Sequence, residues 1–322
     1  MALSAAQGNG VSAGIAGVEQ PMRKQLCDAL LARSSDPAMV FLTGDLGFMA
    51  LESLQAAMGE RFINAGVAEQ NMVSVAAGLS RQGFDAWVYS IAPFCYARPF
   101  EQIRNDITFH QLPVHLIGNG GGYGYGVMGP THHAIEDYGI LLTLPNMKVF
   151  VPVFDEDVEH VVAKTGKDTH STYLRLGRGE PPAGYVVPGY APWRKLLSGN
   201  GPVVIAVGPL AGTYIEALRA MPEDVRPEFW AVSELPLALT PPPVEVMKRV
   251  AAHGRLCIAE EHVAHGSFAS EFALYMLGQG VFARMQHLCA RAHQYSRYGS
   301  QNYLRAQSGL DPRSLLSALA AG

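Results

Sequence analysis

Apolar and polar residues are distributed along the chain in short segments that alternately predict helices and strands. The first periodic segment, residues 21–33, begins with proline and repeats apolar residues at helical spacing, which predicts a helix. Short apolar runs bounded by turn residues predict buried strands, and a polar run over 101–106 predicts a further helix. The predicted strands cover 40–43, 86–90, 113–117, 148–152 and 173–179.

A second series of segments follows residue 200. Apolar runs at 202–208, 229–232 and 256–262 alternate with helical patterns over about 210–220 and 243–252. The whole pattern indicates an α/β protein of two domains, each with a mostly parallel sheet flanked by helices. The expected parts are a flexible segment without periodicity (1–18), a first domain (19–185), a Pro- and Gly-rich linker (186–200) and a smaller second domain (201–322).

Composition adds information about partners. The 322 residues suffice for two cores, and charged residues make up only 16% against an ordinary value of about 25%. This shortage of charge indicates surface buried against other subunits. The net charge is −4 and the basic residues are scattered, so we expect neither a nucleic acid nor a membrane as partner. No apolar run approaches the roughly 18 residues that span a bilayer, and no signal pattern opens the chain, so a cytoplasmic location is expected.

The main candidate for chemistry is Glu69, in the sequence Gly-Val-Ala-Glu-Gln-Asn-Met over residues 66–72. A strand-like run leads into a glycine turn there, and a helix-compatible run follows. An acid near a helix N-terminus with apolar neighbours is a candidate for a buried carboxylate whose pKa is perturbed. The alternative, which position alone leaves open, is a first-turn acid that complements the helix dipole.

This stretch, with Arg-Phe-x-Asn over 61–64 before it, resembles the pyrimidine-binding domain of thiamine-diphosphate enzymes of the transketolase family. The resemblance implies that Glu69 hydrogen-bonds the cofactor's aminopyrimidine, favours its imino tautomer and so helps to deprotonate the thiazolium C2. A carboxyl can share a proton with a weakly basic ring nitrogen only when it is held away from water. Further motifs extend the resemblance to about residues 19–315, namely G-P-T-H at 129–132, L-P-N-M at 144–147 and A-E-E-H at 259–262.

Two other stretches are expected at the cofactor. Asp45 and Leu46 lie in a turn at the carboxyl end of a strand, where open α/β sheets bind ligands, although an aspartate there is also an ordinary turn residue. The resemblance implies that this pair lies against the cofactor. The run F-x-x-x-R-x-F-E-Q-I-R over 94–104 could be core. The resemblance implies instead that an aromatic ring stacks on the pyrimidine, with Phe94 the first choice and Tyr96 the second.

A glycine run over 118–126 precedes the next candidate. It is a weak match to a dinucleotide-binding loop, because no helix start follows and Pro130 interrupts the pattern. The histidine pair His132-His133 could suggest a metal, but no further ligand completes a site. The resemblance implies that His132 contacts substrate oxygens near the reacting carbon, which a neutral imidazole can do as donor and acceptor. His133 is interpreted as structural.

Arg175 and Arg178 follow in the sequence R-L-G-R. They could be ordinary surface residues. The resemblance points to Arg178 as an anchor for the substrate's phosphate, helped by Arg23, because a planar, permanently charged guanidinium suits phosphate.

The chain also departs from the family. Complete transketolases carry a G-D-G motif with a downstream Asn that binds Mg²⁺ and the diphosphate, and this sequence has no G-D-G. We therefore expect the second half of a split transketolase, with the metal ligands on a diphosphate-binding partner chain, none here, and an α2β2 assembly.

The predicted substrate pocket differs as well. Met128 replaces an aspartate before G-P-T-H, Met49 or a neighbour replaces a serine, and a pocket histidine maps near Gly120. These changes favour a small ketose or 2-oxo substrate with fewer hydroxyls than a pentose phosphate.

The leading prediction is thiamine-diphosphate-dependent transfer of a two-carbon ketol or related acyl unit between carbonyl compounds. One alternative is the β subunit of a 2-oxoacid dehydrogenase, whose glutamate motif lacks the E-Q-N-M continuation and which lacks G-P-T-H. A deoxyxylulose-phosphate-synthase-like carboligase is closer in motif but is one long chain. A non-catalytic α/β binding protein is the alternative from another class.

Overall fold

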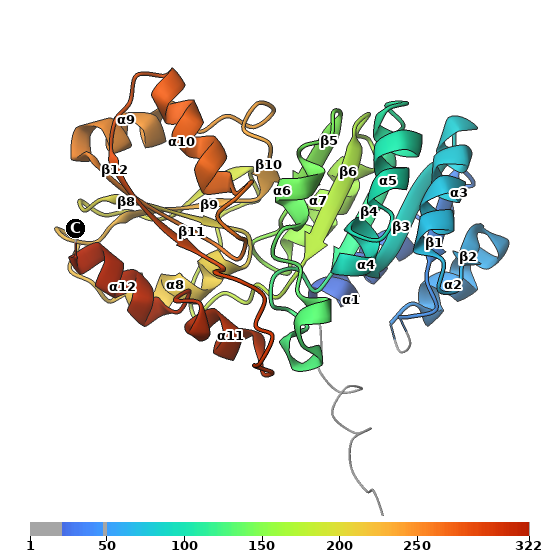
Figure 1. Ribbon diagram of the computed structural model, residues 1–322, viewed down its shortest axis with the longest axis horizontal. Coiled ribbons are helices and arrows are strands. Elements are labelled where there is room, and N and C mark those ends of the chain that lie inside the picture. The colour runs from blue at the N-terminus through green and yellow to red at the C-terminus, as the bar shows by residue number, and fades with distance from the viewer. Residues whose placement is uncertain (1–20, 48–49, 322) are drawn as a thin grey trace, which may run out of the picture.

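Two parallel sheets, one in each half of the chain, organise the computed structural model, which describes residues 21–47 and 50–321. Figure 1 shows the two resulting domains side by side, the first on the right in blue to green and the second on the left in yellow to red. The α/β class with two mostly parallel sheets is therefore confirmed. The expected flexible segment 1–18 and the departure at Met49 lie outside the described residues.

The first sheet has seven strands in the order β10-β5-β6-β4-β3-β1-β2. All pairs are parallel except β10 with β5. In β1, Met39 and Phe41 pack into the core on one face while Val40 and Leu42 pack on the other, because side chains alternate along a strand and both faces are covered. The strands are β1 (Met39–Thr43), β2 (Phe62–Asn64), β3 (Asp85–Ile91), β4 (Val114–Asn119), β5 (Met147–Phe150), β6 (Ser171–Leu176) and β10 (Glu234–Leu235).

Helices cover both faces of this sheet. One face carries α1 (Pro21–Leu31), α2 (Glu52–Met58) and α7 (Asp157–Thr165), and the short η1 (Gly59–Arg61) joins α2 to β2. The other carries α3 (Glu69–Arg81), α4 (Ala92–Tyr96), α5 (Phe100–Gln102), the π-helical segment η2 (Ile103–Thr108) and α6 (Asp137–Leu141). Two 3-10 turns, η3 (Gly126–Met128) and η4 (Pro130–His132), follow β4.

The second sheet has the order β12-β11-β8-β9-β7, parallel except for β7 against β9. The predicted linker is wrong over its last residues, because β7 lies within 186–200 and pairs as an edge strand. The segment Trp-Arg-Lys-Leu-Leu over 193–197 has no apolar–polar alternation and follows a Pro-rich stretch, so the local pattern does not indicate a strand. The elements are β7 (Trp193–Leu197), β8 (Val203–Val207), β9 (Glu228–Val232), β11 (Arg255–Glu260) and β12 (Arg284–Cys289), with α8 (Leu210–Arg219), α9 (Val244–His253), α10 (Phe268–Gly278), α11 (Gln301–Gln307) and α12 (Pro312–Ala320).

The domains are joined by backbone pairing and by buried polar groups. Strand β10 follows β9 of the second domain but extends the first sheet beside β5. Arg175 of β6 pairs with Asp137 at 2.8 Å and donates to the carbonyls of Ala134 and Glu261, so one side chain ties both domains. A continuous apolar core also runs from one domain into the other.

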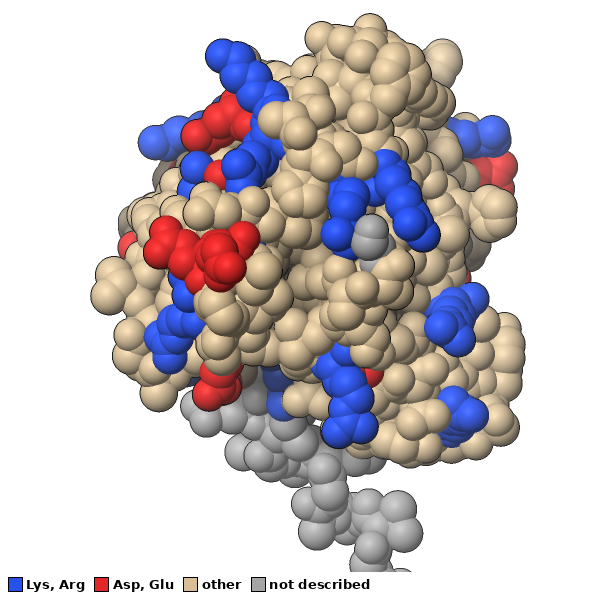
Figure 2. Space-filling view, turned by 90° about the vertical axis from the view of Figure 1, so that its left-hand side faces the viewer, with Lys and Arg blue, Asp and Glu red and all other residues tan. Residues whose placement is uncertain are grey.

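The outer surface of the second domain carries charges of both signs. Lys and Arg side chains lie in separate small groups among uncharged residues (Figure 2), with no broad basic surface on this face. Within 21–47 and 50–321, no helix combines the length and the apolar character needed to cross a bilayer.

Candidate active site

Five parallel strands of the first sheet end at one edge, and the loops beyond their carboxyl ends carry the predicted site residues. Ligands of open α/β sheets bind at this edge. The residues are Asp45 after β1, Glu69 after β2, Phe94 after β3, His132 after β4 and Arg178 after β6.

Glu69 is the first residue of α3 and is buried, with 6% of its surface exposed. Both interpretations of this acid therefore hold in part, because it lies in the first helical turn and is also withdrawn from water. The preceding turn places it there: Gly66 adopts a positive φ of 67°, and its amide donates to the Asn64 side chain at 2.8 Å. Val67, two residues before the carboxylate, is 80% exposed.

The Asp45 turn is tied to the loop that leads to Glu69. The Asp45 amide donates to the Gly66 carbonyl at 3.0 Å, and Asn64 Nδ2 donates to Asp45 Oδ1 at 3.4 Å. A Cβ at Gly44 would lie 3.2 Å from the same carbonyl, so glycine permits the close approach. Leu46 beside it is half-buried. The two turns thus form one wall of the site.

The two aromatic candidates lie in different surroundings. Phe94 is half-buried, and its ring centre lies 5.2 Å from that of His132 in an edge-to-face arrangement. Tyr96 is 1% exposed and packs in the core against Tyr173. Residues two apart on a helix point to different sides, so only one of the two rings reaches the loops at the edge. That ring is Phe94.

His132 ends η4 and faces Phe94. Burial and, secondarily, the charge of Arg98 lower the pKa of His132. Its imidazole is therefore neutral at neutral pH, the form that can both donate and accept. Thr131 Oγ1 lies 2.9 Å from Nδ1, which leaves Nε2 for a ligand.

His133, its neighbour, points the other way into the interdomain contact. Burial lowers its pKa to about 4, and its ring stacks on that of His293 from the second domain, with centres 5.7 Å apart. The structural interpretation of His133 agrees with this placement.

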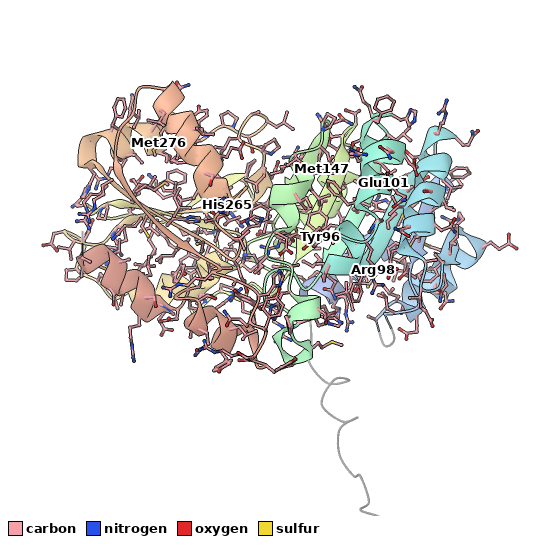
Figure 3. The ribbon with its side chains drawn as sticks, viewed as in Figure 1. Tyr96, Arg98, Glu101, Met147, His265 and Met276 are labelled. Atoms are coloured by element: carbon pink, nitrogen blue, oxygen red, sulfur yellow. The ribbon has the colours of Figure 1, made fainter. Side chains whose placement is uncertain are left out.

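Sequence reasoning missed Arg98, which connects the candidates. Its Nη1 donates to Glu69 Oε1 at 2.9 Å, and its Cζ lies 3.9 Å from the centre of the Phe94 ring. Figure 3 labels it beside Tyr96, near the edge of the first domain. The sequence does carry a signal for Arg98, because it is the arginine of the F-x-x-x-R run that also contains the aromatic candidates.

Sequence reasoning also missed Tyr125 and Asn119. Asn119 Nδ2 donates to the Tyr125 hydroxyl at 2.7 Å, and the Tyr125 and His132 ring centres are 6.3 Å apart. A Cβ at Gly120 would lie 2.2 Å from Tyr125 Cδ2, so the phenol fills the space that a side chain at position 120 would need. Met128 ends η3 nearby and is half-buried. Only the packing of the folded chain reveals the place of Tyr125, because nothing in a glycine run indicates which tyrosine turns inward.

The arginines separate into buried and accessible ones. Arg175 is buried and paired with Asp137, so its role is structural. Arg178, beyond the end of β6, is exposed. Arg23, half-buried on α1, lies beside Tyr89, where burial raises the pKa of the phenol and Arg23 opposes that rise.

The glycine run is explained by packing. A Cβ at Gly121 would lie 2.5 Å from Arg175, one at Gly122 2.4 Å from Glu261, and one at Gly118 2.2 Å from the Tyr173 hydroxyl. Gly118 lets the end of β4 pass close to Tyr173 of β6, and Gly121 and Gly122 let the following segment pass close to the interdomain side chains Arg175 and Glu261. This is a different use from cradling a phosphate.

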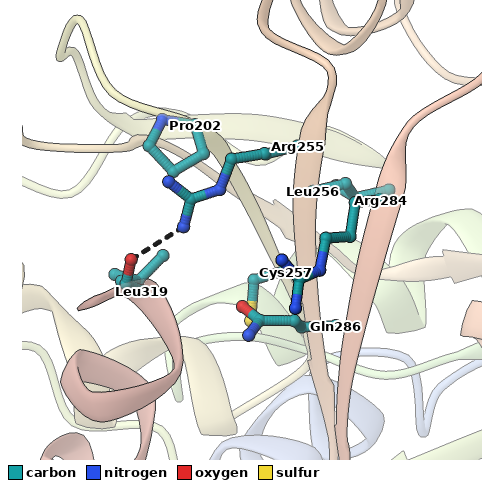
Figure 4. A pocket seen from close by; sticks show the side chains of 7 residues that line it. All are labelled: Pro202, Arg255, Leu256, Cys257, Arg284, Gln286 and Leu319. Atoms are coloured by element: carbon teal, nitrogen blue, oxygen red, sulfur yellow. Dashed lines mark hydrogen bonds between the residues drawn. The ribbon is translucent and has the colours of Figure 1, made fainter. Parts of the chain in front are cut away.

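Hollows elsewhere in the molecule do not overlap the candidate residues. One of about 370 Å³ lies at the amino ends of β5 and β6, beside His170 and Pro236. Another of about 10 Å³ lies between β11, β12 and α12, where Arg255 donates to the Leu319 carbonyl (Figure 4). Residues 21–47 and 50–321 also contain no cluster of three or more His, Cys, Asp or Glu that could hold a metal ion.

Comparison with known proteins defines the class. The family described as "Transketolase, pyrimidine binding domain" matches residues 3–183, more than half of the chain. The chain belongs to the transketolase family, with a transferase function of the thiamine-diphosphate-dependent type.

Individual relatives narrow the comparison. The chain is 29% identical to a subunit of apulose-4-phosphate transketolase from Phocaeicola vulgatus, over 77% of this chain and 81% of the relative. It is 30% identical to 1-deoxy-D-xylulose-5-phosphate synthase 2 of Geobacter sulfurreducens over 82% of this chain, but spans only 43% of that protein. A solved structure named "Split gene transketolase, inactive beta4 tetramer" superposes with a TM-score of 0.77 at 28% identity, covering 93% of this chain and 97% of that one. The chain thus corresponds to the C-terminal, pyrimidine-binding part of a transketolase.

Proposed function

We propose that this chain is one subunit of a split transketolase-like enzyme that transfers a two-carbon ketol or related acyl unit between small carbonyl compounds. The observation that carries the proposal is the meeting of Glu69, Phe94 and His132 at one sheet edge, linked through Arg98. A buried carboxylate, a half-buried aromatic ring and a neutral imidazole fit the pyrimidine half of thiamine diphosphate and its substrate.

In this proposal each residue has a separate task. When bound, thiamine diphosphate supplies the carbon nucleophile that carries the transferred unit. Glu69 holds a proton between its carboxyl and the aminopyrimidine. Phe94, rather than the buried Tyr96, stacks on that ring, and the turn of Asp45 and Leu46 closes the wall behind it.

His132 acts on the substrate side. Its lowered pKa keeps the imidazole neutral, and with Nδ1 held by Thr131, Nε2 is the atom that can donate to or accept from a substrate oxygen, according to the tautomer. Its ring centre is 5.2 Å from that of Phe94, so a small substrate next to the cofactor would lie within its reach.

The substrate's far end would meet cations. Arg178 and Arg23 are the candidate anchors for a phosphate. Arg178 follows the end of β6, and Arg23 lies beside Tyr89, near the carboxyl end of β3. Neither takes part in the buried ion pair of Arg175. Met128 on the rim offers no hydrogen bond to a sugar hydroxyl, which favours a ketose or 2-oxo compound with few hydroxyls. We propose neither nucleic acid nor membrane as partner.

The other half of the site would come from a second polypeptide. Mg²⁺ prefers oxygen ligands from carboxylate and phosphate, and the sequence lacks the G-D-G that supplies them in complete transketolases. Val67, two residues before Glu69, is 80% exposed, as expected where another chain covers this turn. We propose an assembly of two such chains with two diphosphate-binding chains, α2β2. The name of the apulose-4-phosphate transketolase relative, a subunit, supports the existence of a partner chain, and the split-gene structure, an inactive β4 tetramer, supports self-association.

A deoxyxylulose-phosphate-synthase-like carboligation is the second candidate, because that relative shares 30% identity over most of this chain. Product analysis with a 2-oxo acid and with a ketose donor would separate the two reactions. The transketolase reaction returns a shortened aldehyde from the ketose, whereas the carboligase releases CO₂ from the acid.

The proposal is tested by calorimetry and turnover with and without the partner. The isolated chain should bind thiamine diphosphate with Mg²⁺ poorly and be inactive, and the reconstituted complex should bind and turn over. Micromolar binding with turnover by the isolated chain would contradict the split arrangement, and an inactive, non-binding complex would contradict the enzyme function.

A further inference from the structure

Arg98 occupies both partners that the proposed function gives to the aminopyrimidine. The guanidinium donates to Glu69 Oε1 at 2.9 Å and lies 3.9 Å above the Phe94 ring. A guanidinium is planar and permanently charged, so it can stack on an aromatic face and pair with a carboxylate at once. An aminopyrimidine is also planar and uses the same two kinds of contact.

We propose that Arg98 is a placeholder for the pyrimidine: it fills the pyrimidine position on Glu69 and Phe94 in the cofactor-free chain and leaves that position when the cofactor binds. The inference rests on the proposed function, because it takes Glu69 and Phe94 as the pyrimidine's partners. It adds a residue with a competing role to the site.

Space explains why Arg98 has to leave rather than share the site. The guanidinium lies over the Phe94 ring, with its Cζ 3.9 Å from the ring centre, and it also holds Glu69 Oε1. A pyrimidine that stacks on the same ring and bonds to the same carboxylate would overlap the guanidinium. The two groups therefore exclude each other between Glu69 and Phe94.

The surroundings of Arg98 allow it to leave. It lies in the turn between α4 and α5, and its side chain is 47% exposed, whereas that of Glu69 is 7% exposed. The contacts of the guanidinium within the described residues are Glu69 and Phe94, and its carbonyl accepts a long 3.4 Å bond from Gln70. The half-exposed Arg98–Glu69 ion pair and the cation–π contact with Phe94 are both weak interactions. Because both have to break before the cofactor binds, they should weaken the apparent affinity for the cofactor by about 5- to 20-fold.

The test replaces Arg98 by methionine, which keeps an unbranched stem and removes the charge and the donors. Thiamine diphosphate is titrated by calorimetry, at fixed Mg²⁺, into the complex of this chain with its diphosphate-binding partner. Arg98→Met should lower the Kd about 5- to 20-fold, because no pair has to break. Arg104→Gln, which removes an exposed arginine on the next helical segment, should leave the Kd unchanged.

Inorganic pyrophosphate with Mg²⁺ provides a ligand-side control. It has no pyrimidine, so wild type and Arg98→Met should bind it equally. A gain for both ligands would show a general effect of charge and overturn the placeholder role.

The remaining outcomes are also decisive. An unchanged or higher Kd for thiamine diphosphate in Arg98→Met, with normal binding by wild type, overturns the inference and leaves the proposed function intact. A structure of the complex with thiamine diphosphate bound in which Arg98 still pairs with Glu69 would also overturn the inference and leave the proposed function intact. Absence of binding by the wild-type complex overturns both.

Discussion

Two glutamate–arginine pairs in this protein have the same chemistry in opposite surroundings. Glu261 and Arg305 are each 5% exposed and lie 2.7 Å apart, and Glu261 also accepts from Gln301 and the Tyr123 amide. Glu69 is just as buried, but Arg98, which donates to its carboxylate, is about half exposed. One carboxylate is fully engaged within the chain, and the other is held by a side chain that can move.

The difference separates structure from function at residues that look alike in sequence. A buried carboxylate whose donors are all fixed and internal stabilises the fold, because removing it strands those donors. A buried carboxylate that faces a half-exposed cation, next to an exposed Val67, is available to a ligand. Burial of the carboxylate does not distinguish Glu69 from Glu261, but the exposure of the paired arginine does.

The largest effect is expected on stability at the closed pair. Glu261→Ala leaves the buried Arg305 guanidinium and the Tyr123 amide without their acceptor and should lower the free energy of unfolding by about 3–5 kcal/mol. Urea unfolding measures this. Glu60→Ala, at an exposed carboxylate, should change it by less than about 0.5 kcal/mol. A loss below about 1 kcal/mol at Glu261 would mean that the network contributes little.

The next largest effect is on catalysis at the open pair. Glu69→Gln should lower turnover of the reconstituted complex by about 10²-fold or more, since an amide cannot hold the shared proton. Its unfolding free energy should change little, because the partner Arg98 is half exposed and can be solvated. Glu101→Gln, on the adjacent helix, is the matched carboxyl-to-amide control. Near-normal turnover in Glu69→Gln would show that Glu69 does not act on the cofactor.

A smaller effect is expected at the accessible arginine. Arg178→Ala should raise KM about tenfold for a phosphorylated substrate with little change in kcat, because an anchor far from the reacting carbon binds ground and transition state alike. Initial rates with phosphorylated and unphosphorylated substrates measure it. Equal losses on both substrates would place Arg178 with the structural arginines.

The smallest effect concerns the neighbouring histidines. The folded pKa of His133 is lowered to about 4, so on acidification from about pH 6.5 to 5 the unfolded chain takes up a proton there and the folded chain does not. Stability therefore falls over this range, and His133→Asn should remove about 1 kcal/mol of that fall. Urea unfolding at the two pH values tests it. His132→Asn should remove less, because His132 is less buried, and the reverse order would contradict the assignment.

The architecture and the main candidate residues could be predicted from the amino-acid pattern. Uniform apolar runs alternating with helical periods predict parallel sheets covered on both faces, and β1, β3, β4, β5 and β6 follow those runs. The chain order also places Asp45, Glu69, Phe94 and His132 beyond strand ends, which lie at one edge in a parallel sheet. These features depend on local pattern and on topology, which a sequence carries.

The partners of each side chain, by contrast, depend on the folded structure. Arg98 reaches Glu69 across 29 residues, Arg175 turns inward to Asp137 while Arg178 stays exposed, and Phe94 rather than Tyr96 faces the edge. Strand β7 within the predicted linker and β10 in the first sheet are decided in the same way. Such choices follow from contacts between distant segments, because hydrogen bonding and burial depend on neighbours in space that a local pattern does not specify.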